Sequence, residues 1–139
     1  MTDAGATRAV FLDRDGVINE VVLREGKPHP PASVEALEIL PGVAEAIASL
    51  REAGLRVVVV TNQPDVRTGV QRREVVEAMH ERLGRELLID DFRVCFPVDA
   101  DGCACRKPAP GLLREAAEAL RVDLSRSFLV GDRWRDVGA

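Results

Sequence analysis

Four consecutive valines near the middle of the chain limit its possible folds more than any other feature. They belong to the run Leu55 to Val60, which is short, apolar and β-branched, as is typical of a buried strand in a parallel sheet. Upstream, Val43, Ile47 and Leu50 recur at helical spacing, and another apolar run covers residues 9–12. Strand, helix and strand in this order form a βαβ unit. The sequence therefore predicts an α/β fold with a parallel sheet.

The same alternation continues toward the end of the chain. Apolar spacing predicts helices over residues 72–88 and 110–120, and short apolar runs predict strands at 92–96 and 127–130. Met79 would be core filler in the first of these helices, whereas its neighbour His80 is expected on the charged outer face, without a functional role. We expect helices on both faces of the sheet.

We expect the segment between the first strand and the first helix to lie over one edge of the sheet. Residues 17–23 are apolar and β-branched and suit a flap or a hairpin, whereas residues 24–31 contain too many prolines and glycines for regular structure. We expect an irregular loop there, with His29 as a solvated residue rather than a ligand.

Length, charge and cysteine content narrow the class of protein. The 139 residues suit a single domain, 1–139, with a core of its own. A net charge of −4 gives no general attraction to nucleic acid or to an anionic membrane, and no apolar run is long enough to span a bilayer. Three cysteines within 11 residues do not suit a disulfide framework, which favours a reducing, cytoplasmic setting.

Polar side chains follow the predicted strands. Because the carboxyl ends of parallel strands share one edge of a sheet, these side chains should lie together. Taken singly, Asp13 with Asp15 could be a turn, and Thr61-Asn62 and Arg106-Lys107 are better explained as an ordinary turn and a solvated basic pair. Four clusters at one edge together indicate a functional site. The clusters are Asp13 with Asp15, Thr61 with Asn62, Arg106 with Lys107, and Asp132 with Asp136.

The chemistry of these groups suits phosphoryl transfer. Aspartates are oxygen ligands of the kind that Mg²⁺ prefers, and the metal lets a carboxylate approach a phosphate of the same charge. One carboxylate can then attack phosphorus, while a second protonates the leaving oxygen and later accepts a proton from water. Lys107, Thr61 and Asn62 would donate hydrogen bonds to the phosphoryl oxygens.

In this order the clusters resemble the signature of the haloacid dehalogenase superfamily of phosphatases. More closely, the chain is similar to the subgroup that contains the heptose-bisphosphate phosphatase and the histidinol-phosphate phosphatase domain. The resemblance implies a Rossmann-like core without a large cap domain. It is carried by Asp13-Arg14-Asp15-Gly16-Val17-Ile18-Asn19, Leu40-Pro41-Gly42-Val43, Thr61-Asn62-Gln63, Cys103-Ala104-Cys105-Arg106-Lys107-Pro108, and Gly131-Asp132 with Asp136.

The resemblance also implies catalytic roles for individual residues. Asp13 would be the nucleophile that forms an aspartyl-phosphate, and Asp15 would be the general acid and base. Thr61 and Lys107 would steady the phosphoryl group. The residues expected to contact the substrate are Asn19, Asn62, Gln63, Arg106 and Arg133.

A magnesium site is implied in the same way. The metal would bind the carboxylate of Asp13, the backbone carbonyl of Asp15 and the carboxylate of Asp132, while Asp136 would orient this shell. We therefore expect Mg²⁺ as the cofactor, with metal ligands drawn from two of the polar clusters.

The cysteines suit a zinc loop that lacks one ligand. The subgroup carries Cys-x-His, a spacer and Cys-x-Cys; here Cys95, Cys103 and Cys105 stand at the cysteine positions, but Pro97 stands at the histidine position. A structural zinc wants four ligands, so we expect zinc binding to be weak or absent. The fourth ligand would have to be Asp99, Asp101 or water, and the alternative is a metal-free loop of three thiols.

The chain ends at Ala139, where the subgroup continues with a helix and a fifth strand. Without them, the strand that carries Asp132 is expected to be an exposed edge, and we expect marginal stability and uncertain activity.

The resemblance implies a small phosphorylated substrate, with D-glycero-D-manno-heptose 1,7-bisphosphate as the first choice and histidinol phosphate as the second. A catalytically inactive binding module is the alternative from another class. A nucleic-acid end phosphatase is disfavoured by the acidic balance of the chain. We expect a monomer or weak oligomer.

Overall fold

The computed structural model describes residues 8–96 and 111–131. Strands and helices alternate along these two segments, as the βαβ pattern predicts. The elements are β1 (Ala9–Leu12), β2 (Val22–Arg24), β3 (Lys27–His29), α1 (Val43–Glu52), β4 (Arg56–Asn62), α2 (Pro64–Arg67), α3 (Arg73–Glu86), β5 (Asp91–Cys95), α4 (Gly111–Leu120), the 3₁₀ helix η2 (Leu124–Arg126) and β6 (Phe128–Val130).

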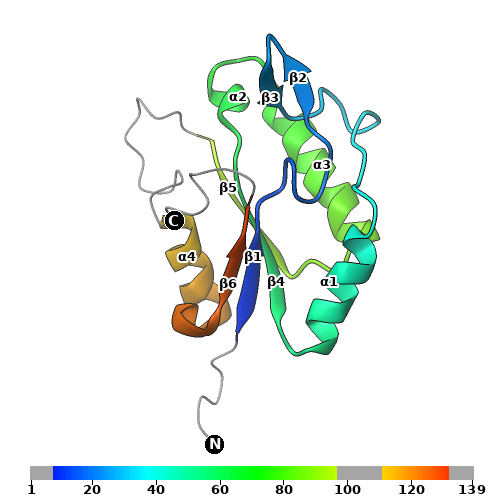
Figure 1. Cartoon of the computed structure of the whole chain (residues 1–139). Coiled ribbons are helices and arrows are strands. Elements are labelled where there is room, and N and C mark those ends of the chain that lie inside the picture. Colours follow the sequence, from blue (N-terminus) through cyan, green and yellow to red (C-terminus); the bar gives the residue numbers. More distant parts are fainter. Residues whose placement is uncertain (1–7, 97–110, 132–139) are drawn as a thin grey trace, which may run out of the picture.

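Four of the strands form one parallel sheet in the order β5-β4-β1-β6. Val10 of β1 pairs with Val57 of β4 on one side and with Phe128 of β6 on the other. The predicted parallel sheet is therefore confirmed, and all four strands point their carboxyl ends toward the same edge (Figure 1).

Helices cover both faces of this sheet, as expected (Figure 1). Because successive strand residues point to opposite faces, the valines of β4 divide between two apolar cores. Val57 and Val59 pack with residues of α1 and α3, whereas Val58 and Val60 pack with residues of α4. A strand buried on both faces needs no polar alternation, which explains the continuous run of valines.

The outer strand β6 leaves apolar surface uncovered. Phe128 is 56% exposed and Val130 is 45% exposed, and β6 stands at the end of the strand order. Within residues 8–96 and 111–131, β6 is thus the outermost strand on this side of the sheet.

The predicted irregular loop over residues 24–31 is wrong for most of its length. Strands β2 and β3 form an antiparallel hairpin in which Val22 pairs with His29. Glu25 and Gly26 both have positive φ angles, 53° and 76°, which is the backbone of a tight two-residue hairpin turn. Pro28 is tolerated because a two-stranded ribbon consists only of edge strands.

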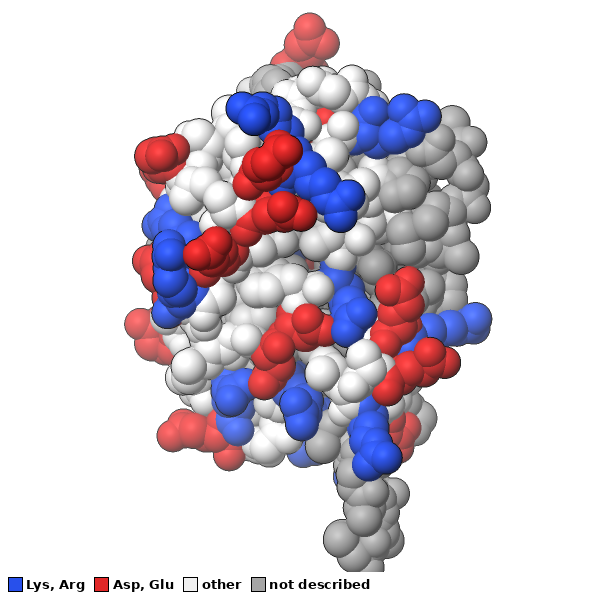
Figure 2. Space-filling model, turned by 180° about the vertical axis from the view of Figure 1, so that it is seen from behind, with Lys and Arg blue, Asp and Glu red and all other residues white. Residues whose placement is uncertain are grey.

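Charged side chains of both signs are interspersed on the face shown in Figure 2. On α3, Arg73 pairs with Glu77 and Arg85 pairs with Glu81, each within one helical turn. Such exposed pairs contribute little to stability, so α3 is held mainly by its apolar face. No helix in the two described segments is both long and apolar enough to cross a membrane.

Candidate active site

Strand β1 ends at Leu12, and the next residue, Asp13, is buried at the carboxyl edge of the sheet. The Asp13 backbone N–H donates to the carbonyl of Val130 (3.0 Å), which ties the ends of β1 and β6 together. The Asp13 carboxylate accepts a hydrogen bond from the backbone N–H of Arg14 (2.9 Å). The expected nucleophile is therefore held in place by backbone groups at the sheet edge.

After Asp15 the chain makes a tight turn that brings Asn19 back beside the Asp15 side chain. Gly16 has a φ of 86°, a conformation that glycine adopts at little cost, and its N–H donates to the carbonyl of Asn19 (2.8 Å). Ile18 inserts into the apolar core inside the turn. As a result, the Asn19 amide reaches the Asp15 carboxylate four residues earlier (3.0 Å).

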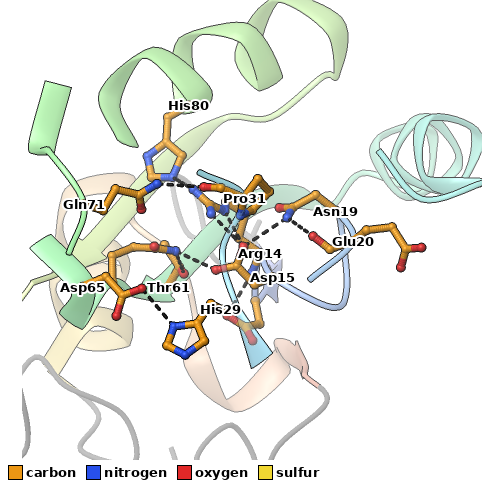
Figure 3. A network of polar contacts seen from close by, with 12 residues as sticks. Arg14, Asp15, Asn19, Glu20, His29, Pro31, Thr61, Asp65, Gln71 and His80 are labelled. Atoms are coloured by element: carbon orange, nitrogen blue, oxygen red, sulfur yellow. Dashed lines mark hydrogen bonds and ion pairs between the residues drawn. The ribbon is translucent and has the colours of Figure 1, made fainter. Parts of the chain in front are cut away.

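The Asp15 carboxylate is fixed through both of its oxygens (Figure 3). Its Oδ1 accepts from Arg14 Nη2 (2.7 Å), Arg14 Nε (3.2 Å) and Asn19 Nδ2 (3.0 Å). Its Oδ2 accepts from Gln63 Nε2 (2.8 Å). Three side chains thus determine where the expected acid and base lies.

Gln63 joins Asp15 to the end of β4. Its Nε2 also donates to Thr61 Oγ1 (2.9 Å), and its backbone N–H donates to the carbonyl of Cys95 (2.8 Å). The amide nitrogen must face Asp15, because the amide oxygen would oppose a carboxylate. As a result, Gln63 Oε1 is buried and has no hydrogen-bond partner among the residues that the structure describes. Thr61 Oγ1 accepts from Gln63 and donates to the carbonyl of Asn62 across a longer distance, 3.5 Å.

The Gln63 and Asn19 side chains are both buried, with Asn62 half-buried beside them. Both amides donate to Asp15, Gln63 also donates to Thr61 Oγ1, and Asn19 also donates to the carbonyl of Glu20 (2.9 Å). The sequence pattern did not reveal these contacts, because a motif gives the position of a residue along the chain but not the direction of its side chain. The expected contacts of Asn19, Asn62 and Gln63 with the substrate stay predictions.

The prediction that His80 lies on the outer face of its helix is wrong. His80 is only 8% exposed, and its Nε2 lies 3.2 Å from Nη1 of the fully buried Arg14. Its ring stacks on Phe92 of β5, with 4.7 Å between the ring centroids. His80 lies four residues after Val76 and three before Leu83, so helical spacing places it on the buried face of α3. The charged residues Glu81 and Arg82 next to it in the sequence concealed this signal.

The prediction that His29 is a solvated loop residue is also wrong. His29 lies on β3, and its Nδ1 is 3.1 Å from Oδ2 of Asp65 on α2 (Figure 3). This contact connects the hairpin to the segment that follows β4. The hairpin is thereby anchored beside the carboxyl edge of the sheet, on the side where the acidic pair lies (Figure 1).

The remaining predicted site residues lie outside the described segments, so their roles stay predictions. They are Cys103, Cys105, Arg106, Lys107, Asp132, Arg133 and Asp136.

Cys95 is the one predicted zinc ligand within the described segments. It ends β5, is buried and is disulfide-bonded. Zinc binds thiolates, and a sulfur in a disulfide is not one. The described part of the zinc loop therefore lends no support to a zinc site.

The donors at the sheet edge suit a hard cation. Asp13 supplies a carboxylate and Asp15 supplies a backbone carbonyl, and oxygen atoms of this kind are the ligands that Mg²⁺ prefers. In residues 8–96 and 111–131, no three His, Cys, Asp or Glu side chains gather into a metal-binding group. A complete magnesium site needs a further ligand, and Asp132 is the residue expected to supply it.

Comparisons with known proteins agree with this geometry. A family model described as haloacid dehalogenase-like hydrolase matches residues 29–139. Two curated relatives, from Rhodopseudomonas palustris and Pseudomonas aeruginosa, are each named D-glycero-beta-D-manno-heptose-1,7-bisphosphate 7-phosphatase. They are 40% and 41% identical to this chain, and each alignment covers 94% of this chain and 76% and 73% of the respective relative.

Solved structures of phosphatases are also similar to this chain in fold. The crystal structure of a D,D-heptose 1,7-bisphosphate phosphatase from B. bronchiseptica, complexed with magnesium and phosphate, has a TM-score of 0.82 and 35% identity. That match covers 94% of this chain and 73% of the other. A putative HAD-like phosphatase from Mesorhizobium loti has a TM-score of 0.80 and 32% identity, with coverage of 96% and 67%. This chain belongs to the haloacid dehalogenase-like hydrolases.

Proposed function

We propose that this protein is a magnesium-dependent phosphatase for a small phosphorylated sugar, with D-glycero-D-manno-heptose 1,7-bisphosphate as the leading substrate. The observation that carries the proposal is the pair of carboxylates at the end of β1, one held by backbone groups and the other by three side chains. The names of the relatives at 40% and 41% identity support the choice of substrate.

The two carboxylates have different surroundings, which suits different roles. Asp13 attacks phosphorus through a carboxylate oxygen, so that a new O–P bond forms while the bond from phosphorus to the sugar oxygen breaks. Asp15 gives its proton to that leaving oxygen. It then takes a proton from the water that attacks the aspartyl-phosphate and releases inorganic phosphate.

The supporting residues hold this arrangement before substrate binds. Gln63 keeps Asp15 and Thr61 at a fixed separation, because one amide nitrogen donates to both. Thr61 would exchange its long hydrogen bond to the Asn62 carbonyl (3.5 Å) for one to a phosphoryl oxygen, and Lys107 would add a positive charge there. Mg²⁺, when bound by Asp13, the Asp15 carbonyl and Asp132, offsets the repulsion between phosphate and carboxylate.

The proposal is tested by measuring phosphate release from heptose 1,7-bisphosphate, histidinol phosphate and a panel of sugar phosphates, with and without Mg²⁺. We expect turnover that requires the metal and that Asp13→Asn abolishes. Asp91→Asn is the matched control, since Asp91 lies at the opposite end of the sheet and pairs with Arg93. Absence of turnover on every substrate would reject the enzymatic role and favour a binding module, and preference for histidinol phosphate would replace the leading substrate.

A further inference from the structure

A buried histidine stands behind the arginine of the acidic turn. His80 of α3 lies against Arg14, with 3.2 Å between His80 Nε2 and Arg14 Nη1, and both side chains are buried (Figure 3). The stack on Phe92 of β5, with an angle of 13° between the two ring planes, fixes the plane of the imidazole. The contact therefore joins two elements of the core to the turn between Asp13 and Asp15.

The direction of this hydrogen bond fixes the state of the histidine. A guanidinium group only donates, so His80 Nε2 must be the acceptor and the ring proton must sit on Nδ1. Burial, together with the positive charge of Arg14, lowers the pKa of His80 to about 3. The ring is accordingly neutral at physiological pH, and a neutral ring is the form that can accept from Arg14.

Arg14 divides its donors between two partners. Its Nε and Nη2 both point at Oδ1 of Asp15, whereas Nη1 points away from Asp15 toward His80. Because a guanidinium is planar, fixing Nη1 also fixes the directions of the other two donors. If His80 no longer accepted, the buried Nη1–H of Arg14 would lose its partner, and the hydrogen bonds from Arg14 to Asp15 would be less well fixed in direction.

We propose that His80 is a positioning residue: as a neutral acceptor it holds the Arg14 guanidinium in the plane that places the Asp15 carboxyl for proton transfer. This inference rests on the proposed function for the identity of Asp15 as the acid and base. It adds His80, which lies on α3 and is remote in sequence from the four polar clusters, to the residues that determine the rate of phosphate release.

A difference between substrates tests this role. An alkyl phosphate needs its leaving oxygen protonated, whereas p-nitrophenyl phosphate has a leaving group that departs with little help from an acid. Asp15 also activates the water that hydrolyses the aspartyl-phosphate, a step common to both substrates, so the comparison uses kcat/KM, which reports the steps up to loss of the leaving group. We expect His80→Leu to lower kcat/KM for the sugar phosphate about tenfold or more relative to its effect on p-nitrophenyl phosphate. Equal losses of kcat/KM on both substrates would mean that His80 does not act through protonation of the leaving oxygen, and would overturn the proposal.

A conservative variant and a small molecule sharpen the test. His80→Gln keeps an oxygen acceptor and should retain kcat within about threefold, since an amide oxygen can accept from Arg14. His80→Ala should regain activity when imidazole is added, because a pocket of about 300 Å³ borders His80 and Phe92. Failure of both His80→Gln and imidazole to restore the rate would contradict a role as an acceptor.

A measurement without substrate separates this inference from the proposed function. In ¹⁵N-labelled protein, the His80 ring should show the neutral form with the proton on Nδ1 at both pH 7 and pH 5. His29, the other histidine of the chain, serves as the internal reference. A charged ring, or a proton on Nε2, would overturn the inference even in an active enzyme, whereas an inactive protein with the expected tautomer would refute only the enzymatic role.

Discussion

The side-chain amide of Gln63 donates to Oδ2 of Asp15 across 2.8 Å, and so links the end of β4 to the turn after β1. The same nitrogen donates to Thr61 at 2.9 Å. One uncharged residue therefore sets the distance between the proposed acid and a proposed phosphate ligand. The two strands that carry these groups are neighbours in the sheet, which makes so short a connection possible.

Replacement of Gln63 by leucine should lower kcat more than it changes KM. The leucine fills the space but donates no hydrogen bond, so Asp15 and Thr61 lose their common support. We expect a loss in kcat of about tenfold to a hundredfold, a fraction of what a general acid contributes. Steady-state kinetics on the best substrate measures this effect.

Gln71→Leu is the matched control for that experiment. Gln71 is also a glutamine with a buried Oε1, but its amide nitrogen donates to the carbonyl of Pro31 (2.7 Å), away from Asp15 and Thr61. It should leave kcat within about threefold, because no proton-transfer group depends on it. If both variants lost kcat equally, the role assigned to Gln63 would be wrong.

The contact between His29 and Asp65 should hold the hairpin over the site. Removing it with His29→Ala frees β2 and β3 from α2, so we expect a higher KM with a smaller change in kcat. A double-mutant cycle with Asp65→Ala should give a coupling energy of about 0.5 to 1 kcal/mol, as is usual for a partly exposed pair. Additive effects of the two substitutions on KM would show that the contact does not order the hairpin.

Leu83 of α3 and Leu88, which lies two residues after the end of the helix, test which side chains hold this segment to the sheet. Leu83 is fully buried in the core shared with α1, whereas Leu88 is 58% exposed. Leu83→Ala should lower the free energy of unfolding by about 2 to 5 kcal/mol, since it leaves a cavity. Leu88→Ala should change it by less than about 1 kcal/mol. Urea unfolding monitored by circular dichroism compares the two, and similar losses would contradict the assigned core.

The low pKa of His80 predicts a loss of stability in acid. The unfolded chain binds a proton near pH 6.5, whereas the folded chain does so only near pH 3, so stability falls as the pH drops through this window. At about 1.4 kcal/mol per pH unit, the His80 contribution to the free energy of unfolding should fall by about 2 kcal/mol between pH 7 and pH 5.

His80→Gln isolates this contribution, because glutamine does not titrate while the carboxylates remain the same. Urea unfolding of the two proteins at pH 7 and pH 5 gives the difference. A pH dependence equal to that of the wild type would show that His80 titrates normally in the folded protein.

The local sequence pattern was enough to predict the parallel strands of the sheet and the edge at which the candidate site lies. The valines of β4 and the apolar run of β1 specify buried parallel strands whatever surrounds them, because only burial on both faces suits such runs. The carboxyl ends of those strands then share one edge by geometry alone. Asp13, Asp15 and Thr61 could thus be assigned to one site before any contact was known.

Tertiary structure alone decided what lies behind that site. Helical spacing puts His80 on the same face as Val76 and Leu83, but only the packing of α3 against β5 places its ring on Phe92 and its Nε2 against Arg14. Similarly, only the turn after β1 and the end of β4 show that Asn19 and Gln63 point at Asp15. Contacts between side chains distant in sequence depend on how helices and strands pack, and this information is not present in a local pattern.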